Sequence, residues 1–160
     1  MRILGIDPAL NITGYGVIDV NDNKLFLLEA GIIKTTAKQL LPERLNRIYQ
    51  GLTGLISETK PDVMVLEKLY AHYHHPTTAY ILGHARGVIC LTSIQADIPL
   101  VEYAATRIKK AIVGRGLASK HQVQRMVMDF LGLKRVPEYT DITDALALAI
   151  AHSNIMKFKL

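Results

Sequence analysis

Residues 2–20, RILGIDPALNITGYGVIDV, hold two apolar segments separated by a turn that begins after Asp7. RILGID and YGVIDV have the short apolar patterns of strands, and Pro8 with the small residues after it ends the first one. A third apolar segment, residues 24–34, follows the turn-forming cluster 21–23. The three strands are therefore expected to pair as an antiparallel meander whose first strand ends on a carboxylate.

Beyond this meander, helical and strand patterns alternate. Pro42 opens a helix with one apolar stripe, and Pro61 ends it by forcing Lys60 out of helical geometry. The later segments are expected to be a buried strand at 63–67, a helix at 77–95 and a short strand at 98–103. Two helices follow within 103–128, and a C-terminal helix spans 141–156. This order predicts an α/β fold with a mixed five-stranded sheet and helices on both faces.

Length and composition fit a single globular domain. The chain has 160 residues, 49% of them hydrophobic, and can bury a substantial core without disulfides. Its only cysteine, Cys90, has apolar neighbours and is expected to be buried. We expect one domain over residues 1–156 and a short tail, 157–160. Neither a signal leader nor an apolar stretch of roughly 20 residues is found, so we expect a cytoplasmic protein without membrane contact.

Four carboxylates stand where strands end or a helix begins. Asp7 closes the first strand and Glu67 closes VMVLE, whereas Asp141 and Asp144 open the last helix. The strand-end acids meet if their strands are neighbours, and acids three apart in a helix share a face. Hard divalent ions such as Mg²⁺ prefer oxygen ligands, so the set indicates metal-dependent phosphoryl transfer. Taken alone, the helical pair also fits the ordinary preference for acids at a helix start.

The segment from Tyr103 to Met128 contains no Asp or Glu, although the chain as a whole has a formal net charge of only +5. Its basic residues are Arg107, Lys109, Lys110, Arg115, Lys120 and Arg125. A segment of one charge sign attracts polyanions such as nucleic acid. The alternative is a solvated basic face.

The helix expected at 77–95 is rich in small residues, with Gly83, Ala85 and Gly87 in its centre. Glycine lowers helix stability, so its presence suggests that another element approaches closely. That element is either the core sheet or a second copy of the protein across a two-fold axis.

Taken in order, these motifs resemble the RuvC family of Holliday-junction resolvases. DPALNITGYGV is similar to the family's opening D-P-G-x-x-x-T-G-x-G-V, and LGHARGV, EYAATRIKKAIVGRGLASKHQVQRMV and DITDALALAIAH resemble its later motifs, over about Met1 to His152. The resemblance implies a ribonuclease-H-like fold and a homodimer that makes paired Mg²⁺-dependent nicks in four-way DNA junctions during recombination and repair. It also implies a branch-migration helicase complex as a partner.

By the same resemblance, the four acids match the family's metal-binding set, with two Mg²⁺ ions per site and Mn²⁺ as a substitute. These acids are Asp7, Glu67, Asp141 and Asp144. Lys109 and Lys120 match family lysines near the cleaved phosphate, where they are expected to stabilise developing negative charge. Simple contact with a backbone phosphate is the alternative for each lysine.

DNA contacts are expected from residues outside the metal site. Tyr70 matches a family aromatic and is expected to stack at the junction centre, or else to pack over the sheet edge. Arg86 matches the family's ARG triplet and is expected to contact DNA or to pair within the protein. The remaining expected contacts are Arg107, Lys110, Arg115 and Arg125.

The chain departs from the family pattern in three places. Ala9 stands where the family has glycine, and Arg115, Leu117 and Ser119 differ from common residues of the basic segment. The loop AHYHHPTT places His74 near a family asparagine. Its three histidines, His72, His74 and His75, have no interleaved Cys or acid, which favours a loop that touches DNA over a zinc site.

Three other functions fit parts of the pattern. A junction-binding module without nuclease activity needs the basic segment but not four acids. An ATP-dependent sugar-kinase or actin-like domain fits Asp7-Pro8 followed by Thr13-Gly14, but it needs two related halves. A nuclease for RNA–DNA hybrids would share the chemistry but not the order of motifs.

Overall fold

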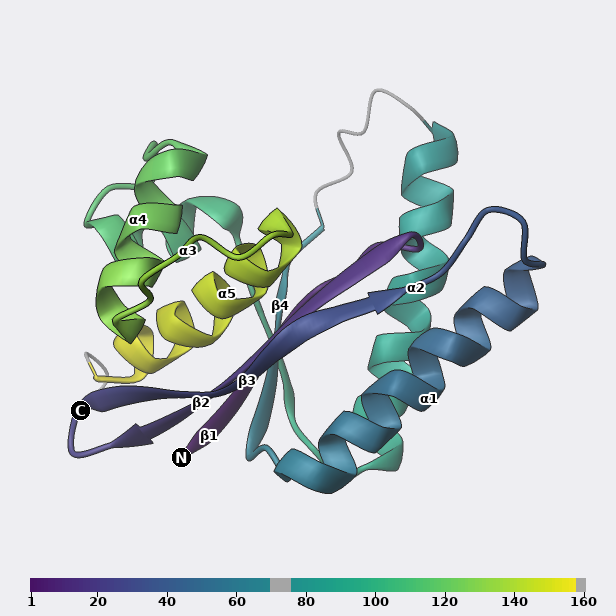
Figure 1. Ribbon diagram of the computed structural model, residues 1–160, viewed down its shortest axis with the longest axis horizontal. Coiled ribbons are helices and arrows are strands. Elements are labelled where there is room, and N and C mark those ends of the chain that lie inside the picture. The colour runs from purple at the N-terminus through teal and green to yellow at the C-terminus, as the bar shows by residue number, and fades with distance from the viewer. Residues whose placement is uncertain (70–75, 158–160) are drawn as a thin grey trace.

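The computed structural model describes residues 1–69 and 76–157, which form a five-stranded sheet flanked by helices (Figure 1). The strands are β1 (Arg2–Asp7), β2 (Ile12–Asn21), β3 (Lys24–Lys34), β4 (Val63–Glu67) and β5 (Leu100–Tyr103). The helices are α1 (Leu41–Thr59), α2 (Pro76–Gln95), α3 (Ala105–Val113), α4 (Lys120–Leu131) and α5 (Thr140–Lys157). In these two ranges, no helix has the length and apolar character needed to cross a membrane.

The strand order is β3-β2-β1-β4-β5, and the sheet is mixed as expected. β1, β2 and β3 form the antiparallel meander, whereas β4 and β5 run parallel to β1. Since β1 and β4 are parallel neighbours, their last residues, Asp7 and Glu67, come to the same edge of the sheet. Sites in α/β proteins commonly lie at this carboxyl edge.

The boundaries of most elements lie close to their expected positions. β2 begins at Ile12, before the expected start, because Ile12 and Thr13 continue the pairing with the end of β3. α1 ends at Thr59, and Lys60 adopts left-handed backbone with φ of 49° before Pro61. The Ser119 N-cap of α4 is confirmed, since its hydroxyl accepts a hydrogen bond from the Gln122 backbone.

Helices cover both faces of the sheet (Figure 1). α3, α4 and α5 pack on the face that includes Ile3 and Val65. α1 and α2 pack on the opposite face, which includes Leu4 and Met64. Both faces of β1 and β4 are thus buried, which explains why RILGID and VMVLE are almost wholly apolar.

Three glycines of β1 and β2 allow α5 to lie directly against the sheet. A Cβ on Gly5 would lie 2.0 Å from the Ala145 carbonyl oxygen, and one on Gly16 would lie 2.5 Å from Leu146. A Cβ on Gly14 would lie 2.2 Å from the Asp141 carbonyl oxygen. The start of α5 is therefore fixed against β2 beside Asp7, the residue paired with Gly14.

The glycines of α2 do not face the core sheet. A Cβ on Gly83 or Gly87 would meet no atom within 4 Å, whereas Ala85 between them is fully buried. The expectation that the core sheet explains these glycines is therefore wrong, because they lie on the outer side of the helix. Close approach of a second copy stays a prediction.

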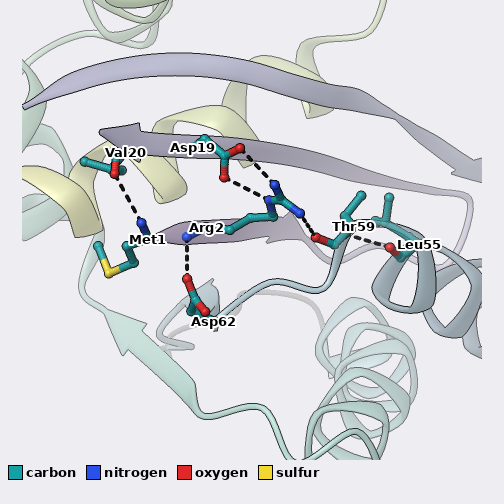
Figure 2. Close-up of polar contacts among 7 residues, drawn as sticks. All are labelled: Met1, Arg2, Asp19, Val20, Leu55, Thr59 and Asp62. Carbon is teal, nitrogen blue, oxygen red and sulfur yellow. Dashed lines mark hydrogen bonds and ion pairs between the residues drawn. The ribbon is translucent and has the colours of Figure 1, made fainter. Parts of the chain in front are cut away.

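A polar cluster ties the elements together at the end of β1 remote from Asp7 (Figure 2). The Arg2 guanidinium donates to both carboxylate oxygens of Asp19, at 2.8 and 2.9 Å, and to the Thr59 carbonyl. The Arg2 backbone N–H donates to Asp62 at 2.6 Å. Arg2 lowers the pKa of Asp19, and these contacts join β1, β2, the end of α1 and the chain entering β4.

Candidate active site

The strand-end acids line one cavity of about 280 Å³ at the carboxyl edge of the sheet. Asp7 reaches it from β1 and Glu67 from β4. Asp144, from the start of α5, lines the same cavity. Asp141 does not line it, but its charge is close enough to raise the pKa of Asp7. The structure thus brings together acids that are up to 137 positions apart in the sequence.

Two lysines add positive charge to this cavity. Lys109, on α3, and Lys120, the first residue of α4, both line it. The Lys120 ammonium lies 2.6 Å from Asp144 Oδ2, and this pairing raises the pKa of Lys120. The capping bond from the Gln122 N–H to Ser119 fixes the first turn of α4 and so the position from which Lys120 extends.

Two of these acids, Asp7 and Glu67, have a raised pKa. Burial, followed by the charges of Asp144 and Asp141, raises the pKa of Asp7 to about 7. Partial desolvation and the Asp144 charge also raise the pKa of Glu67, while Lys109 opposes this shift. Carboxylates crowded in this way repel one another until a cation joins them, so the site favours binding of positive charge.

The donor set fits a hard divalent cation. Among the described residues, no three His, Cys, Asp or Glu side chains form a metal-binding cluster as they stand. In this arrangement the Asp144 carboxylate is paired with the Lys120 ammonium. The ligands available at the cavity are carboxylate oxygens, the type that Mg²⁺ and Mn²⁺ prefer.

Arg86 reaches the site from inside the protein. It is only 9% exposed, and its Nη1 donates a 2.8 Å hydrogen bond to the backbone carbonyl of Glu67. Its Nη2 pairs with the Glu102 carboxylate of β5. The side chain therefore bridges the ends of β4 and β5. This placement favours the internal pairing over the DNA contact that was also expected of Arg86.

The other expected DNA contacts lie on α3, α4 and the turn between them. The Arg107 guanidinium lies 5.3 Å from the centre of the Tyr103 ring, a cation–π arrangement. Lys110, Arg115 and Arg125 are exposed. Tyr70 and the histidines His72, His74 and His75 lie outside the described residues.

The sequence is similar to one protein family along almost its whole length. The profile of the family described as crossover junction endodeoxyribonuclease RuvC matches residues 3–152. The chain belongs to the RuvC family. It is 47% identical to the crossover junction endodeoxyribonuclease RuvC of Rhodopirellula baltica over 148 residues, or 92% of this chain and 83% of the relative. It is 41% identical to RuvC of Alkaliphilus metalliredigens over 159 residues, or 99% of this chain and 96% of the relative.

The fold agrees with this membership. The structure matches Thermus thermophilus RuvC in complex with Holliday junction substrate at a TM-score of 0.93 and 30% identity, covering 99% of this chain and 96% of that one. The expected α/β fold of the ribonuclease-H type is thereby confirmed. RuvC-family nucleases depend on a divalent metal, which agrees with the acids gathered here.

Two side-chain contacts of β5 had no clear signal in the sequence. Glu102, the partner of Arg86, is one acid in a short strand, and only the pairing of Leu66 with Glu102 places it beside Glu67. His152 is buried, and its Nδ1 lies within hydrogen-bond distance of the Tyr103 hydroxyl, at 2.9 Å. Finding the first contact requires the strand order of the sheet, and finding the second requires the packing of α5 against β5.

Proposed function

We propose that this chain resolves four-way (Holliday) DNA junctions by paired symmetric nicks made through metal-dependent hydrolysis. The observation that carries the proposal is the convergence of Asp7, Glu67 and Asp144 with two lysines on one cavity. Membership of the RuvC family supplies the reaction class, an endodeoxyribonuclease acting on crossover junctions in recombination and repair. The similar Thermus thermophilus structure contains Holliday junction substrate, which supports the choice of DNA.

Four residues would hold the metal: Asp7, Glu67, Asp141 and Asp144. We propose two Mg²⁺ ions, replaceable by Mn²⁺, because four carboxylates can supply both bridging and terminal oxygens. Bound by these acids, the ions would supply activation of the attacking water and stabilisation of the leaving oxygen in phosphodiester hydrolysis. The raised pKa of Asp7 means that it must give up its proton before it can act as a ligand.

Lys109 and Lys120 would lower the electrostatic cost of bringing a phosphate to an acidic cavity. Both line that cavity, and the Lys120 ammonium already neutralises part of the charge of Asp144. A phosphate entering beside these lysines meets positive charge in a partly buried site, where the electrostatic attraction between the two is stronger than in bulk water.

The exposed basic residues of α3, α4 and the intervening turn would contact the DNA backbone. These are Arg107, Lys110, Arg115 and Arg125. The cation–π contact with Tyr103 would favour one orientation of the Arg107 side chain, which would reduce the entropy lost when a phosphate binds. Tyr70 keeps its proposed role in stacking at the junction centre. For Arg86 we propose that it positions the end of β4 rather than touching DNA.

The outer face of α2 supports the proposed homodimer. Tyr80, Leu91 and Ile94 are 65%, 52% and 72% exposed, and they flank the open glycines Gly83 and Gly87. A four-way junction has two-fold symmetry, so two coordinated nicks require two sites. We also propose one nuclease domain over 1–156, a branch-migration helicase partner and a cytoplasmic location where the DNA substrate is found.

Carboxylate-to-amide variants test the roles of the acids. Asp7→Asn and Glu67→Gln should bind a synthetic four-way junction with unchanged affinity but lose cleavage in Mg²⁺. Asp22→Asn is the matched control, since Asp22 is an exposed acid in the β2–β3 turn with left-handed backbone that asparagine tolerates. Cleavage by Asp7→Asn at the wild-type rate would refute the assignment, and junction binding without cleavage by the wild type would favour the binding module.

A further inference from the structure

A second group of basic residues lies outside the segment from Tyr103 to Met128. It consists of Lys34 at the end of β3, Lys38 in the following loop, and Arg44 and Arg47 in the first turns of α1. Between residues 34 and 47 the only acid is Glu43. Its carboxylate accepts a hydrogen bond from the Leu40 backbone at 2.9 Å as part of the α1 cap. Along this segment four cations stand against one acid that is already engaged. In space, Glu29 and Glu58 line a hollow together with Lys34 and Arg47, so Lys38 and Arg44 are the cations of the group that lie outside this hollow.

The two arginines are held in place by contacts with neighbouring elements. Arg44 donates from Nε to Thr35 Oγ1 at 2.9 Å and from Nη2 to Asn11 Oδ1. Arg47 donates from Nε to the Lys34 carbonyl at 2.7 Å. Arg44 is half-buried, whereas Lys34, Lys38 and Arg47 are exposed. These contacts fix the start of α1 on the end of β3 and on the loop that follows Asp7.

Sheet register places this group close to the candidate active site. Asp7 pairs with Gly14 of β2, and Gly14 pairs with Ile32 of β3, two residues before Lys34. Strands lie about 4.8 Å apart and residues rise about 3.4 Å along a strand, so the Cα atom of Lys34 lies roughly 12 Å from that of Asp7. Duplex DNA carries about one negative charge per 1.7 Å of axis, so a duplex lying over the acids presents several phosphates within this distance.

α1, which carries Arg44 and Arg47, lies on the side of the sheet that α3 and α4 leave free (Figure 1). α1 covers the face opposite to α3, α4 and α5. The acids at the sheet edge thus have basic residues on both sides. Acids alone repel DNA, and cations on one side only would neutralise phosphates on one side of the cleaved bond.

We propose that Lys34, Lys38, Arg44 and Arg47 form a second phosphate-binding surface, which holds the DNA backbone on the side of the cleaved phosphate opposite to α3 and α4. The proposal rests on the proposed junction-cleaving function and extends it to residues that the family motifs do not mark. The surface recognises backbone phosphate and is indifferent to base sequence.

The test measures how junction affinity depends on salt, in an Asp7→Asn background that cannot cleave. The slope of log affinity against log salt concentration is negative, and each lost phosphate contact reduces its magnitude by about 0.9. The double variant Lys34→Gln/Arg47→Gln should therefore reduce this magnitude by about 1.8, if both residues bind phosphates. Thermal unfolding of each variant checks that the protein is intact.

The matched control removes two charges from the other ends of the same elements. Lys24 begins β3, and Lys60 follows the end of α1. Lys24→Gln/Lys60→Gln changes the net charge equally but should leave the slope unchanged. Equal salt slopes in the two double variants would overturn the proposal. If, in addition, only Lys34→Gln/Arg47→Gln lost binding to an acidic protein, the surface would be assigned to such a partner instead of to DNA. Absence of junction binding in the Asp7→Asn parent would instead count against the proposed function itself.

Discussion

At the scale of single residues, Asp7 combines a cost in stability with a role in chemistry. Burial and neighbouring acids raise its pKa to about 7, far above the ordinary value near 3.9. Because the folded state binds this proton more tightly than the unfolded state, the carboxyl destabilises the fold once it is ionised. A bound cation would remove that cost, so the position is suited to metal binding more than to stability.

Asp7→Asn should therefore stabilise the metal-free protein at neutral pH. The wild type loses unfolding free energy as pH rises from about 4 to about 7, the interval between the unfolded and folded pKa values of Asp7. Asparagine does not titrate. The unfolding free energy of the variant, relative to that of the wild type, should therefore increase by on the order of 2–4 kcal/mol as the pH rises from 5 to 8. Denaturant unfolding in EDTA at both pH values measures the difference; identical pH dependence of the two proteins would contradict it.

Arg86 is predicted to act on metal binding through the position of Glu67. Glu102→Gln keeps a hydrogen-bond acceptor for Arg86 but removes the charge, which is milder than leaving a buried arginine unpaired. We expect a severalfold rise in the Mn²⁺ concentration for half-maximal cleavage and weaker Mn²⁺ binding by calorimetry, with an unchanged KM for the junction. A raised KM with unaltered metal dependence would show that Arg86 contacts DNA instead.

At the scale of elements, the placement of α5 depends on glycines in the strands beneath it. Gly5→Ala should destabilise the protein, since its Cβ would lie 2.0 Å from the Ala145 carbonyl oxygen. Overpacking of this kind costs about 1–3 kcal/mol or more. Gly54→Ala on α1 is the control, because nothing lies within 4 Å of its Cβ and alanine favours a helix by about 1 kcal/mol. Urea midpoints should move in opposite directions; equal midpoints would mean that α5 does not need the glycine.

The sequence predicts elements better than it predicts contacts between them. Apolar periodicity and prolines give the strands, the helices and the strand-end position of Asp7 and Glu67, because these signals are local. The inward direction of Arg86 and the outward direction of Gly83 and Gly87 depend on how α2 is rotated against the sheet. That rotation is set by packing between distant segments, which a single sequence does not display.

At the scale of the whole molecule, the exposed face of α2 is predicted to join two copies. Leu91→Glu/Ile94→Glu should give a monomer by light scattering, because each charge would be buried in the interface. Leu117→Glu is the control, since Leu117 is 93% exposed in the turn between α3 and α4. The monomer should nick junctions singly rather than in pairs. A dimer that survives the double change would place the interface elsewhere.

Strand mapping tests directly whether the site formed by these acids cleaves four-way DNA junctions. A synthetic junction labelled on each strand in turn, and a linear duplex of the same sequence, are incubated with the protein in Mg²⁺ or EDTA. We expect symmetric, religatable nicks in two opposite strands of the junction in Mg²⁺ but not in EDTA, with the linear duplex intact. Equal cutting of the linear duplex, or no cutting of the junction in Mg²⁺ or Mn²⁺, would contradict this expectation.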